Sequence, residues 1–246
     1  MDGQGASKQG EKDSAQMSSA DWIAEVSHEL RLPIANIRLL IETLLNGALD
    51  DKAIATRMLM RAQSEAERLQ SLVSDLLSVE QLASARSEAQ AEWLSLLKRA
   101  EYALESTSKL AKESDVKVEL KIPPDFRVYA NPTQLDQVLL NLLENAIKFT
   151  PAKGQVTIRA GGKEGVFSVE DTGVGMPSQE IPKIFQRFYR IDRAKTRGST
   201  GLGLSIVKHI LDLHGAKITV TSEEGKGSTF LLEFPSPKWA RSYASE

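Results

Sequence analysis

The sequence predicts an α+β protein in which a helical hairpin is followed by an α/β sandwich with a mixed sheet. Two observations indicate this fold class. Up to about residue 83, apolar residues recur every three or four positions, which is typical of amphipathic helices. Beyond residue 90, helical segments alternate with short segments of period two that are joined mostly by hairpin signals.

Changes in composition divide the chain into five segments. Residues 1–17 are rich in Gly, Gln, Ser and Lys and are expected to form a disordered tail or an expression remnant. The helical hairpin occupies residues 18–83, an Ala/Ser/Glu-rich linker occupies residues 84–90, and the sandwich domain occupies residues 91–236. Residues 237–246 are expected to be a C-terminal tail.

Overall composition excludes several classes of protein. The net charge of −2 provides no basic field for nucleic acid. The absence of cysteine excludes disulfides, thiol catalysis and thiolate metal sites. No apolar run approaches the ~20 residues that cross a bilayer. We therefore expect a soluble, cytoplasmic chain, or the soluble part of a larger membrane-anchored protein.

The hairpin has clear start and stop signals. The first helix should run from about Ser18 to Leu45, with a kink at Pro33. Asn46-Gly47 is a helix-stop signal, and Asp50-Asp51 begins the second helix. Two long helices joined by a short turn form an antiparallel hairpin.

Each helix of the hairpin carries only a narrow apolar stripe, so two facing stripes leave a thin core. A second hairpin would complete a four-helix bundle, and we therefore expect a homodimer through this region. The stripes consist of Ile23, Val26, Leu30, Ile34, Ile37, Ile41 and Leu44 in the first helix, and of Ile54, Met58, Ala62, Leu69, Leu72, Leu76 and Val79 in the second.

One histidine lies away from the first stripe. His28 is two positions from Val26 and two from Leu30, so at ~100° per residue it points about 200° away from them. The helix thus presents an imidazole outward, with Glu29 beside it. An exposed histidine on an ordinary helix is the alternative, and only the rest of the chain distinguishes the two.

The second domain is expected to contain strands, helices and glycine-rich turns. Asn131-Pro132 begins a helix that Pro151 ends. Gly161-Gly162 is a hairpin signal between two strands. The expected strands are residues 116–122, 127–130, 156–160, 166–170, 217–221 and 229–234, and further helices lie within residues 93–112 and 204–214.

Polar residues share one face of the helix after Asn131. Asn141, Glu144, Asn145 and Lys148 are spaced by three and four, whereas the opposite face is rich in leucine. Asparagine offers neutral oxygens suited to a magnesium ion that keeps most of its waters. Lys148 offers a positive charge to a phosphate. An ordinary polar helix face is the alternative.

Two glycine-rich segments follow. Residues 170–176 place Asp171 at the end of a strand before two glycines, where a carboxylate can accept a hydrogen bond from an exocyclic amine such as that of adenine. Residues 198–204 lead directly into a helix, whose first N–H groups suit an anion. Aromatic and basic residues between them, at 184–190 and 193–197, suggest a lid over a polyphosphate. A strand-ending turn is the alternative for the first segment.

Together these motifs resemble those of two-component sensor histidine kinases over roughly residues 18–235. The family's histidine box is similar to S-H-E-L-R-L-P at 27–33, and its asparagine box is similar to N-L-L-E-N-A-I-K-F-T at 141–150. Its first and second glycine boxes are similar to D-T-G-V-G at 171–175 and G-S-T-G-L-G-L at 198–204, and its phenylalanine box is similar to the segment at 185–188. All five in this order are specific to the family.

The resemblance implies a protein histidine kinase with ATP and Mg²⁺. His28 would attack the γ-phosphoryl group, and Glu29 would orient the ring and act as general base. Asn145 would hold the magnesium ion. The implied nucleotide-binding residues are Asn141, Glu144, Asn145, Lys148, Asp171, Gly173, Gly175, Arg190, Gly201, Leu202, Gly203 and Thr229.

The resemblance also implies a partner, because the phosphoryl group would pass to an aspartate of a separate response regulator. The family often carries Thr or Asn four residues after the histidine, where this chain has Leu32, so phosphatase activity toward the regulator is expected to be weak. The alternatives are an ATPase of the same Bergerat-type fold and a non-catalytic scaffold that binds a regulator. Specificity for the regulator is expected to lie on surface positions of the first helix below His28 and on the facing part of the second helix.

Overall fold

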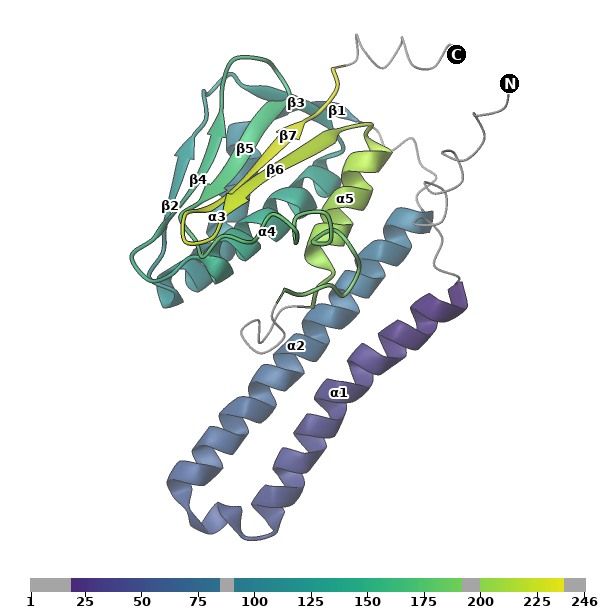
Figure 1. Ribbon diagram of the computed structural model, residues 1–246, viewed down its shortest axis with the longest axis vertical. Coiled ribbons are helices and arrows are strands. Elements are labelled where there is room, and N and C mark those ends of the chain that lie inside the picture. Colours follow the sequence, from purple (N-terminus) through teal and green to yellow (C-terminus); the bar gives the residue numbers. More distant parts are fainter. Residues whose placement is uncertain (1–18, 85–90, 192–199, 237–246) are drawn as a thin grey trace, which may run out of the picture. The chain divides into compact units, whose positions relative to one another are not determined.

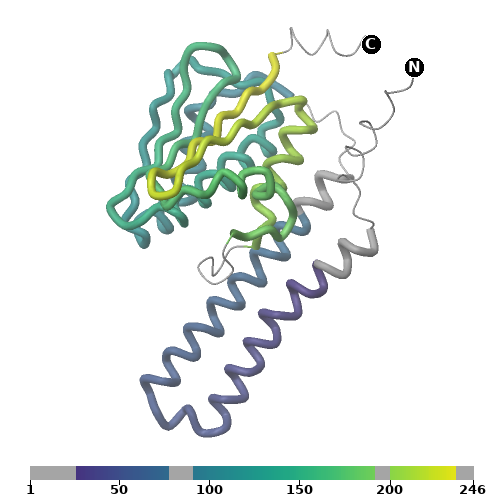
Figure 2. The backbone as a smooth tube through the Cα atoms, viewed as in Figure 1, coloured from purple at the N-terminus to yellow at the C-terminus, as the bar shows by residue number. Residues whose placement is uncertain are grey.

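The computed structural model describes residues 19–84, 91–191 and 200–236 (Figures 1 and 2). The chain divides into two compact units, Met1–Val73 and Ser74–Glu246, and the division falls within the second long helix. No helix in the described residues is both long and apolar enough to cross a membrane.

The order of elements follows the expected organisation. The hairpin consists of α1 (Ser19–Leu45), the short 3₁₀ helix η1 (Ala48–Asp50) and α2 (Lys52–Ser84). The second part consists of β1 (Glu92–Ser95), α3 (Leu96–Glu113), β2 (Lys117–Lys121), β3 (Arg127–Ala130), α4 (Pro132–Phe149), β4 (Gln155–Ala160), β5 (Val166–Asp171), α5 (Gly203–Leu213), β6 (Lys217–Glu223) and β7 (Gly227–Glu233).

The turn of the hairpin is formed by the residues that the sequence indicated. Gly47 adopts a φ of 114°, a conformation that glycine reaches without strain. Asp51 caps α2, because its Oδ1 accepts hydrogen bonds from the N–H groups of Ala53 at 2.9 Å and Ile54 at 3.0 Å. α1 continues through Pro33 as one helix, and the kink there stays a prediction.

The apolar stripe of a single hairpin is only partly covered. Leu44 and Leu72 are buried, at 5% and 1% exposure. In contrast, Ile34 is 53% exposed and Ile41 is 47% exposed, although both belong to the predicted buried face. One hairpin therefore leaves part of its own apolar stripe in contact with water.

The sheet of the second unit is mixed, as predicted. Its strands lie in the order β2-β4-β5-β7-β6, and β2 pairs with β4 in parallel whereas the other pairs are antiparallel. β1 and β3 form a separate two-stranded antiparallel sheet. The three helices α3, α4 and α5 lie on one face of the large sheet (Figure 1). The α/β sandwich is therefore confirmed.

The core lies between these helices and the sheet. Leucine and isoleucine on one side of α4 and α5 pack against apolar side chains that point from the sheet. The fully buried residues include Leu135, Leu139, Leu142, Leu143, Ile147, Ile158, Phe167, Ile206 and Ile210. One side of α4 is buried in this core, so its polar side faces away from the core. That polar side is available to a ligand.

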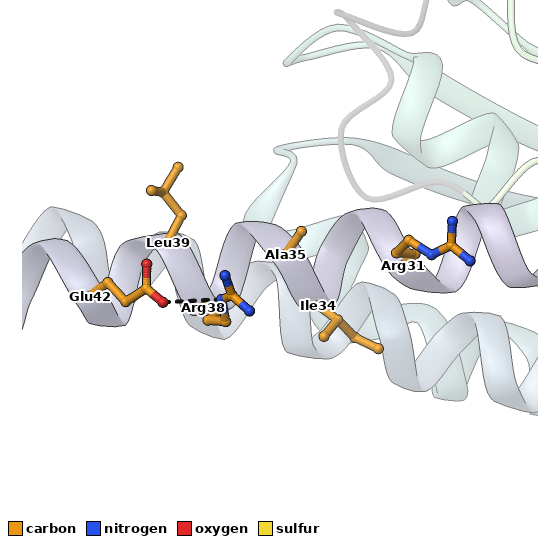
Figure 3. A pocket seen from close by; sticks show the side chains of 6 residues that line it. All are labelled: Arg31, Ile34, Ala35, Arg38, Leu39 and Glu42. Atoms are coloured by element: carbon orange, nitrogen blue, oxygen red, sulfur yellow. Dashed lines mark ion pairs between the residues drawn. The ribbon is translucent and has the colours of Figure 1, made fainter.

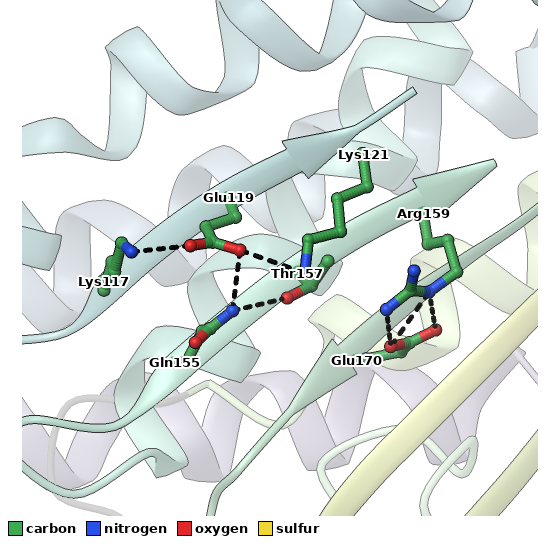
Figure 4. A network of polar contacts seen from close by, with 7 residues as sticks. All are labelled: Lys117, Glu119, Lys121, Gln155, Thr157, Arg159 and Glu170. Carbon is green, nitrogen blue, oxygen red and sulfur yellow. Dashed lines mark hydrogen bonds and ion pairs between the residues drawn. The ribbon is translucent and has the colours of Figure 1, made fainter. Parts of the chain in front are cut away.

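The other face of the sheet carries a polar network (Figure 4). Glu119 pairs with Lys117 at 2.6 Å and Lys121 at 3.2 Å, and these ammonium groups lower the pKa of Glu119. Arg159 pairs with Glu170 across two antiparallel strands at 3.1 Å. Exposed pairs of this kind add little stability, so this face is best described as a solvated surface.

His214 connects three elements of the second unit. Its Nδ1 lies 2.8 Å from the carbonyl oxygen of Ile210, and its Nε2 accepts a hydrogen bond from the backbone N–H of Asn131 at 3.1 Å. The ring also meets Phe234 edge-on at 5.6 Å. Because Nε2 is an acceptor, the ring is neutral here, and burial lowers the pKa of His214.

This environment predicts a loss of stability in acid. The unfolded chain binds a proton at His214 near its ordinary pKa of about 6.5, whereas the folded chain resists protonation. The free energy of unfolding should therefore fall as pH decreases below about 6.5. Urea titrations between about pH 7.5 and 5.5 should show this fall. The fall should be smaller in His214→Phe, whereas the control His209→Gln, on the same helix, should keep it in full.

Candidate phosphoacceptor and nucleotide sites

His28 and Glu29 lie side by side on α1 but face different surroundings. The side chain of His28 is 62% exposed, whereas that of Glu29 is only 11% exposed. Consecutive helical residues point ~100° apart, so one faces solvent while the next turns toward α2. Glu29 Oε1 lies 3.9 Å from His28 Nδ1, which is just beyond hydrogen-bond distance. The expectation of an outward imidazole is confirmed.

Asp171 ends β5 and is fixed by backbone donors. Its Oδ1 accepts hydrogen bonds from the N–H groups of Gly173 at 2.8 Å and Ser228 at 3.2 Å. Burial raises the pKa of Asp171, and these two N–H donors oppose that effect. With Oδ1 engaged, Oδ2 is the oxygen available to accept from a ligand amine.

The loop after Asp171 is held against the turn between β6 and β7. The N–H of Gly225 donates to the carbonyl oxygen of Val174 at 2.8 Å, and the N–H of Met176 donates to Ser222 Oγ at 2.9 Å. Gly175 has a φ of 63°, and a Cβ there would lie 1.9 Å from the carbonyl oxygen of Glu223. Only glycine allows this close approach.

The polar face of α4 joins both glycine-rich segments. Near its C-terminal end, the carbonyl oxygen of Phe149 accepts a hydrogen bond from the N–H of Val174 at 3.1 Å. Near its middle, a Cβ on Gly203 would lie 2.9 Å from Asn141 Oδ1, so the start of α5 closely approaches this face. The residues after Asp171 and the first turn of α5 thus meet the same helix.

The four predicted polar residues of α4 differ in how they are bonded. Asn141 Nδ2 donates to the carbonyl oxygen of Gln137 at 3.0 Å. Lys148 pairs with Glu144 at 2.9 Å. Asn145 makes no side-chain hydrogen bond to a residue that the structure describes. Among the residues that the structure describes, none therefore competes with a ligand for its amide oxygen.

The segment before α5 is tied at its base. The N–H of Phe188 donates to the carbonyl oxygen of Gly201 at 2.9 Å, and Phe188 is buried with a φ of 58°, which is uncommon for a residue with a side chain. Leu202 is fully buried. Arg190 is half-buried on the N-terminal side of this segment. Gly198 and the basic loop 193–197 lie outside the described residues.

Thr229 is the predicted site residue that the structure separates from the others. In the β5–β7 register, Asp171 pairs with Ser228, whereas Thr229 pairs with Glu170. Successive strand residues point to opposite faces, so Thr229 lies on the face of the sheet opposite to Asp171. Ser228 is buried beside Asp171, and its hydroxyl lies 2.9 Å from Ser222 Oγ. Sequence reasoning missed Ser228, because its place depends on strand register.

The donor groups fit magnesium held largely by water and phosphate. The described residues contain no group of three or more His, Cys, Asp or Glu side chains that could enclose a metal ion. Magnesium usually keeps several waters and binds through one or two protein oxygens plus substrate phosphates. Asn145, on a face that the start of α5 approaches, provides such an oxygen.

The structure thus combines a helical hairpin that carries an exposed histidine with an α/β sandwich, and both parts match known families. Residues 18–85 match the family model of the His Kinase A (phospho-acceptor) domain. Residues 130–238 match that of the histidine kinase-, DNA gyrase B- and HSP90-like ATPases. The chain belongs to the two-component sensor histidine kinases and contains their catalytic core.

Individual relatives agree with this family. The sensor histidine kinase WalK of Bacillus subtilis is 36% identical over 232 residues, which cover 92% of this chain and 38% of WalK. Histidine kinase ThkA, solved in complex with response regulator protein TrrA, has a TM-score of 0.69 and 26% identity over 89% of this chain and 62% of that one.

Full-length ShkA, solved in complex with AMPPNP, has a TM-score of 0.60 and 30% identity over 87% of this chain and 45% of that one. Like WalK and ThkA, it extends beyond the matched region. The chain therefore spans less than two thirds of the length of these relatives.

Proposed function

We propose that this chain phosphorylates itself on His28 with ATP and passes the phosphoryl group to an aspartate of a response regulator. The observation that carries the proposal is an exposed imidazole with a buried carboxylate 3.9 Å from its Nδ1. The partly buried carboxylate of Asp171, which has one oxygen held by backbone N–H groups, supports it as a site for the adenine amine. A cytoplasmic location fits an enzyme that consumes ATP.

The chemistry follows from the two nitrogens of the imidazole. Glu29 lies near Nδ1, so Nε2 is the nitrogen that attacks the γ-phosphorus of ATP. The N–P bond forms as the bond from the γ-phosphorus to the bridging oxygen breaks, and ADP leaves. The Nδ1 proton of the phosphorylated ring is then taken by Glu29.

The nucleotide is held by the residues around α4. Asp171 Oδ2 accepts from the adenine amine, and Ser228 replaces Thr229 as the residue proposed beside it. Lys148, Asn141 and the first N–H groups of α5 contact the phosphates. Asn145 holds the magnesium ion, which when bound neutralises charge on the phosphates.

Glu144, Gly173, Gly175, Arg190, Gly201, Leu202 and Gly203 complete the proposed nucleotide site. Two of these residues act through the backbone: Gly175 allows the loop to contact the β6–β7 turn, and Gly203 allows α5 to approach Asn141. Arg190 and Gly201 lie on either side of residues 192–199, which are outside the described residues.

Incubation with γ-labelled ATP and Mg²⁺ tests the proposal. Acid-labile, base-stable label on the protein that is lost in His28→Ala supports the kinase. Release of free phosphate without labelled protein supports the Bergerat-fold ATPase. Absence of both reactions in a chain that binds a regulator supports the scaffold.

The partners proposed are a second copy and a response regulator. The half-exposed Ile34 and Ile41 favour burial of the hairpin in a homodimer. A hollow of about 420 Å³ on α1, C-terminal to His28, is lined by Arg31, Ile34, Ala35, Arg38, Leu39 and Glu42 (Figure 3). Arg31 and Arg38 on this surface are exposed, so a regulator that reaches His28 would pass close to them, whereas Ile34 belongs to the stripe that a second copy would cover.

Leu32 predicts weak phosphatase activity toward the regulator. It lies four residues after His28, on the same side of α1, and is 41% exposed. Its side chain has no group that can orient a water molecule. Leu32→Thr should accelerate dephosphorylation of the phosphorylated regulator by about tenfold or more. Rapid dephosphorylation by the unmodified chain would contradict this prediction, and Leu45→Thr provides a control at the exposed C-terminal end of the same helix.

A further inference from the structure

A buried charged pair lies between α1 and α2 beside His28. Arg68 Nη2 donates a hydrogen bond to Glu29 Oε2 at 3.1 Å. The two side chains are only 14% and 11% exposed. A carboxylate is costly to bury unless a counter-charge and hydrogen bonds compensate for its lost hydration. Arg68 is therefore what allows a charged Glu29 to lie inside the hairpin.

Arg68 is itself held by a second carboxylate. Its Nη1 lies 3.9 Å from Glu65 Oε2, one turn earlier on α2. Glu65 Oε1 accepts from Asn36 Nδ2 on α1 at 3.3 Å. The chain of contacts runs from Asn36 through Glu65 and Arg68 to Glu29, and it crosses between the two helices twice.

These contacts between α1 and α2 are not an efficient way to stabilise the folded hairpin. Arg68 Nε and Glu65 Oε2 are buried without a hydrogen-bond partner among the described residues. Each such group costs free energy in the folded state. Apolar side chains at these positions would avoid that cost. The location of the cluster, one residue from the exposed imidazole, suggests a catalytic purpose instead.

The geometry divides the two oxygens of Glu29 between different tasks. Oε2 is fixed by Arg68, whereas Oε1 is the oxygen that faces His28 Nδ1 at 3.9 Å. Catalytic hydrogen bonds are often this loose before substrate binds. The planar guanidinium fixes the carboxylate in direction as well as in charge, which an ammonium group does less well.

We propose that Arg68 is the positioning residue for Glu29: it holds one carboxylate oxygen so that the other can take the Nδ1 proton of His28. The inference rests on the proposed autophosphorylation and names a residue for it that belongs to neither the histidine box nor the nucleotide site. Arg68 acts through Glu29 and does not itself contact the reacting atoms.

The rate of autophosphorylation as a function of pH tests this role in the full chain. Arg68→Met should lower the initial rate by at least about tenfold and move the acidic limb of the pH profile to higher pH, because the buried carboxylate loses its counter-charge. The KM for ATP should not change. Arg68→Lys should restore part of the rate. Arg61→Met removes an exposed arginine two turns earlier on α2 and should stay within about twofold of the unmodified chain.

A double variant separates positioning from an independent contribution. If Arg68 acts through Glu29, then Glu29→Gln combined with Arg68→Met should be no slower than Glu29→Gln alone. Rate losses that multiply would overturn the inference. The double variant also removes the unpaired buried charge, so it provides a folded comparison if Arg68→Met alone loses helix content. In that case the rate of Arg68→Lys decides, because lysine keeps the positive charge but fixes the direction of the carboxylate less well. A rate equal to that of the unmodified chain overturns the inference.

Failure of the inference and of the proposed function give different results. Label on the unmodified chain, together with an unchanged rate and pH profile in Arg68→Met, contradicts only the role of Arg68. Absence of label on the unmodified chain contradicts the proposed function and overturns the inference with it.

Discussion

Asp171→Asn is expected to weaken ATP binding by about 10- to 150-fold. Hydrogen bonds to charged groups contribute roughly 1.5–3 kcal/mol, and each 1.4 kcal/mol changes affinity tenfold. Because Oδ1 already accepts from Gly173 and Ser228, an amide there keeps its oxygen on those donors and directs its NH₂ at the ligand. The amide NH₂ and the adenine amine are both donors, so the hydrogen bond that the carboxylate accepted from the adenine amine is lost. Isothermal titration with a non-hydrolysable ATP analogue measures the change.

A matched control and a second nucleotide make this result specific. Glu170→Gln removes the neighbouring carboxylate on the opposite face of β5, where Glu170 pairs with Arg159, and should leave ATP affinity unchanged. Inosine triphosphate carries a carbonyl in place of the adenine amine. The unmodified chain should therefore prefer ATP strongly, whereas Asp171→Asn should lose most of that preference. Equal discrimination in both chains would exclude Asp171 as the adenine partner.

Local signals were sufficient for most of the fold. Asp51 predicted the start of α2 because an acidic cap needs only the next three residues. Alternation predicted the strand at 116–122, observed as β2, and Pro132 predicted the start of α4. Each of these features is encoded within a few neighbouring residues. Packing between distant parts of the chain favours the same local structure.

The parts of the site that depend on long-range register were not accessible to sequence reasoning. Ser228 and Thr229 are adjacent and chemically alike, and only the pairing of β5 with β7 shows which one faces Asp171. The contact between Glu29 and Arg68 spans 39 positions and depends on how two helices face each other. The sequence alone contains no feature that distinguishes Arg68 from Arg57 and Arg61 on the same helix.

Asn145→Ala is expected to reduce autophosphorylation by about 10²- to 10³-fold while leaving the fold intact. Asn145 lies on the polar face of α4, where its amide has no partner among the described residues, so truncation leaves no buried group unsatisfied. A bound metal contributes several kcal/mol of charge stabilisation in the transition state, and ~1.4 kcal/mol corresponds to a factor of ten in rate. Labelling with γ-labelled ATP at saturating nucleotide measures the loss.

Titration with Mg²⁺ distinguishes loss of the metal from loss of a nucleotide contact. If Asn145 supplies the protein oxygen, Asn145→Ala should require a higher Mg²⁺ concentration for tight nucleotide binding, whereas nucleotide binding without metal should be unaffected. Asn145→Asp keeps an oxygen ligand and should retain much of the Mg²⁺ dependence, at some cost from a second negative charge beside the phosphates. An unchanged Mg²⁺ dependence in Asn145→Ala would show that phosphates and water bind the metal without Asn145. The described residues contain no cluster of three acidic or histidine ligands that could hold the ion by itself. Asn145 therefore decides whether the protein binds the magnesium ion directly or the ion only accompanies ATP.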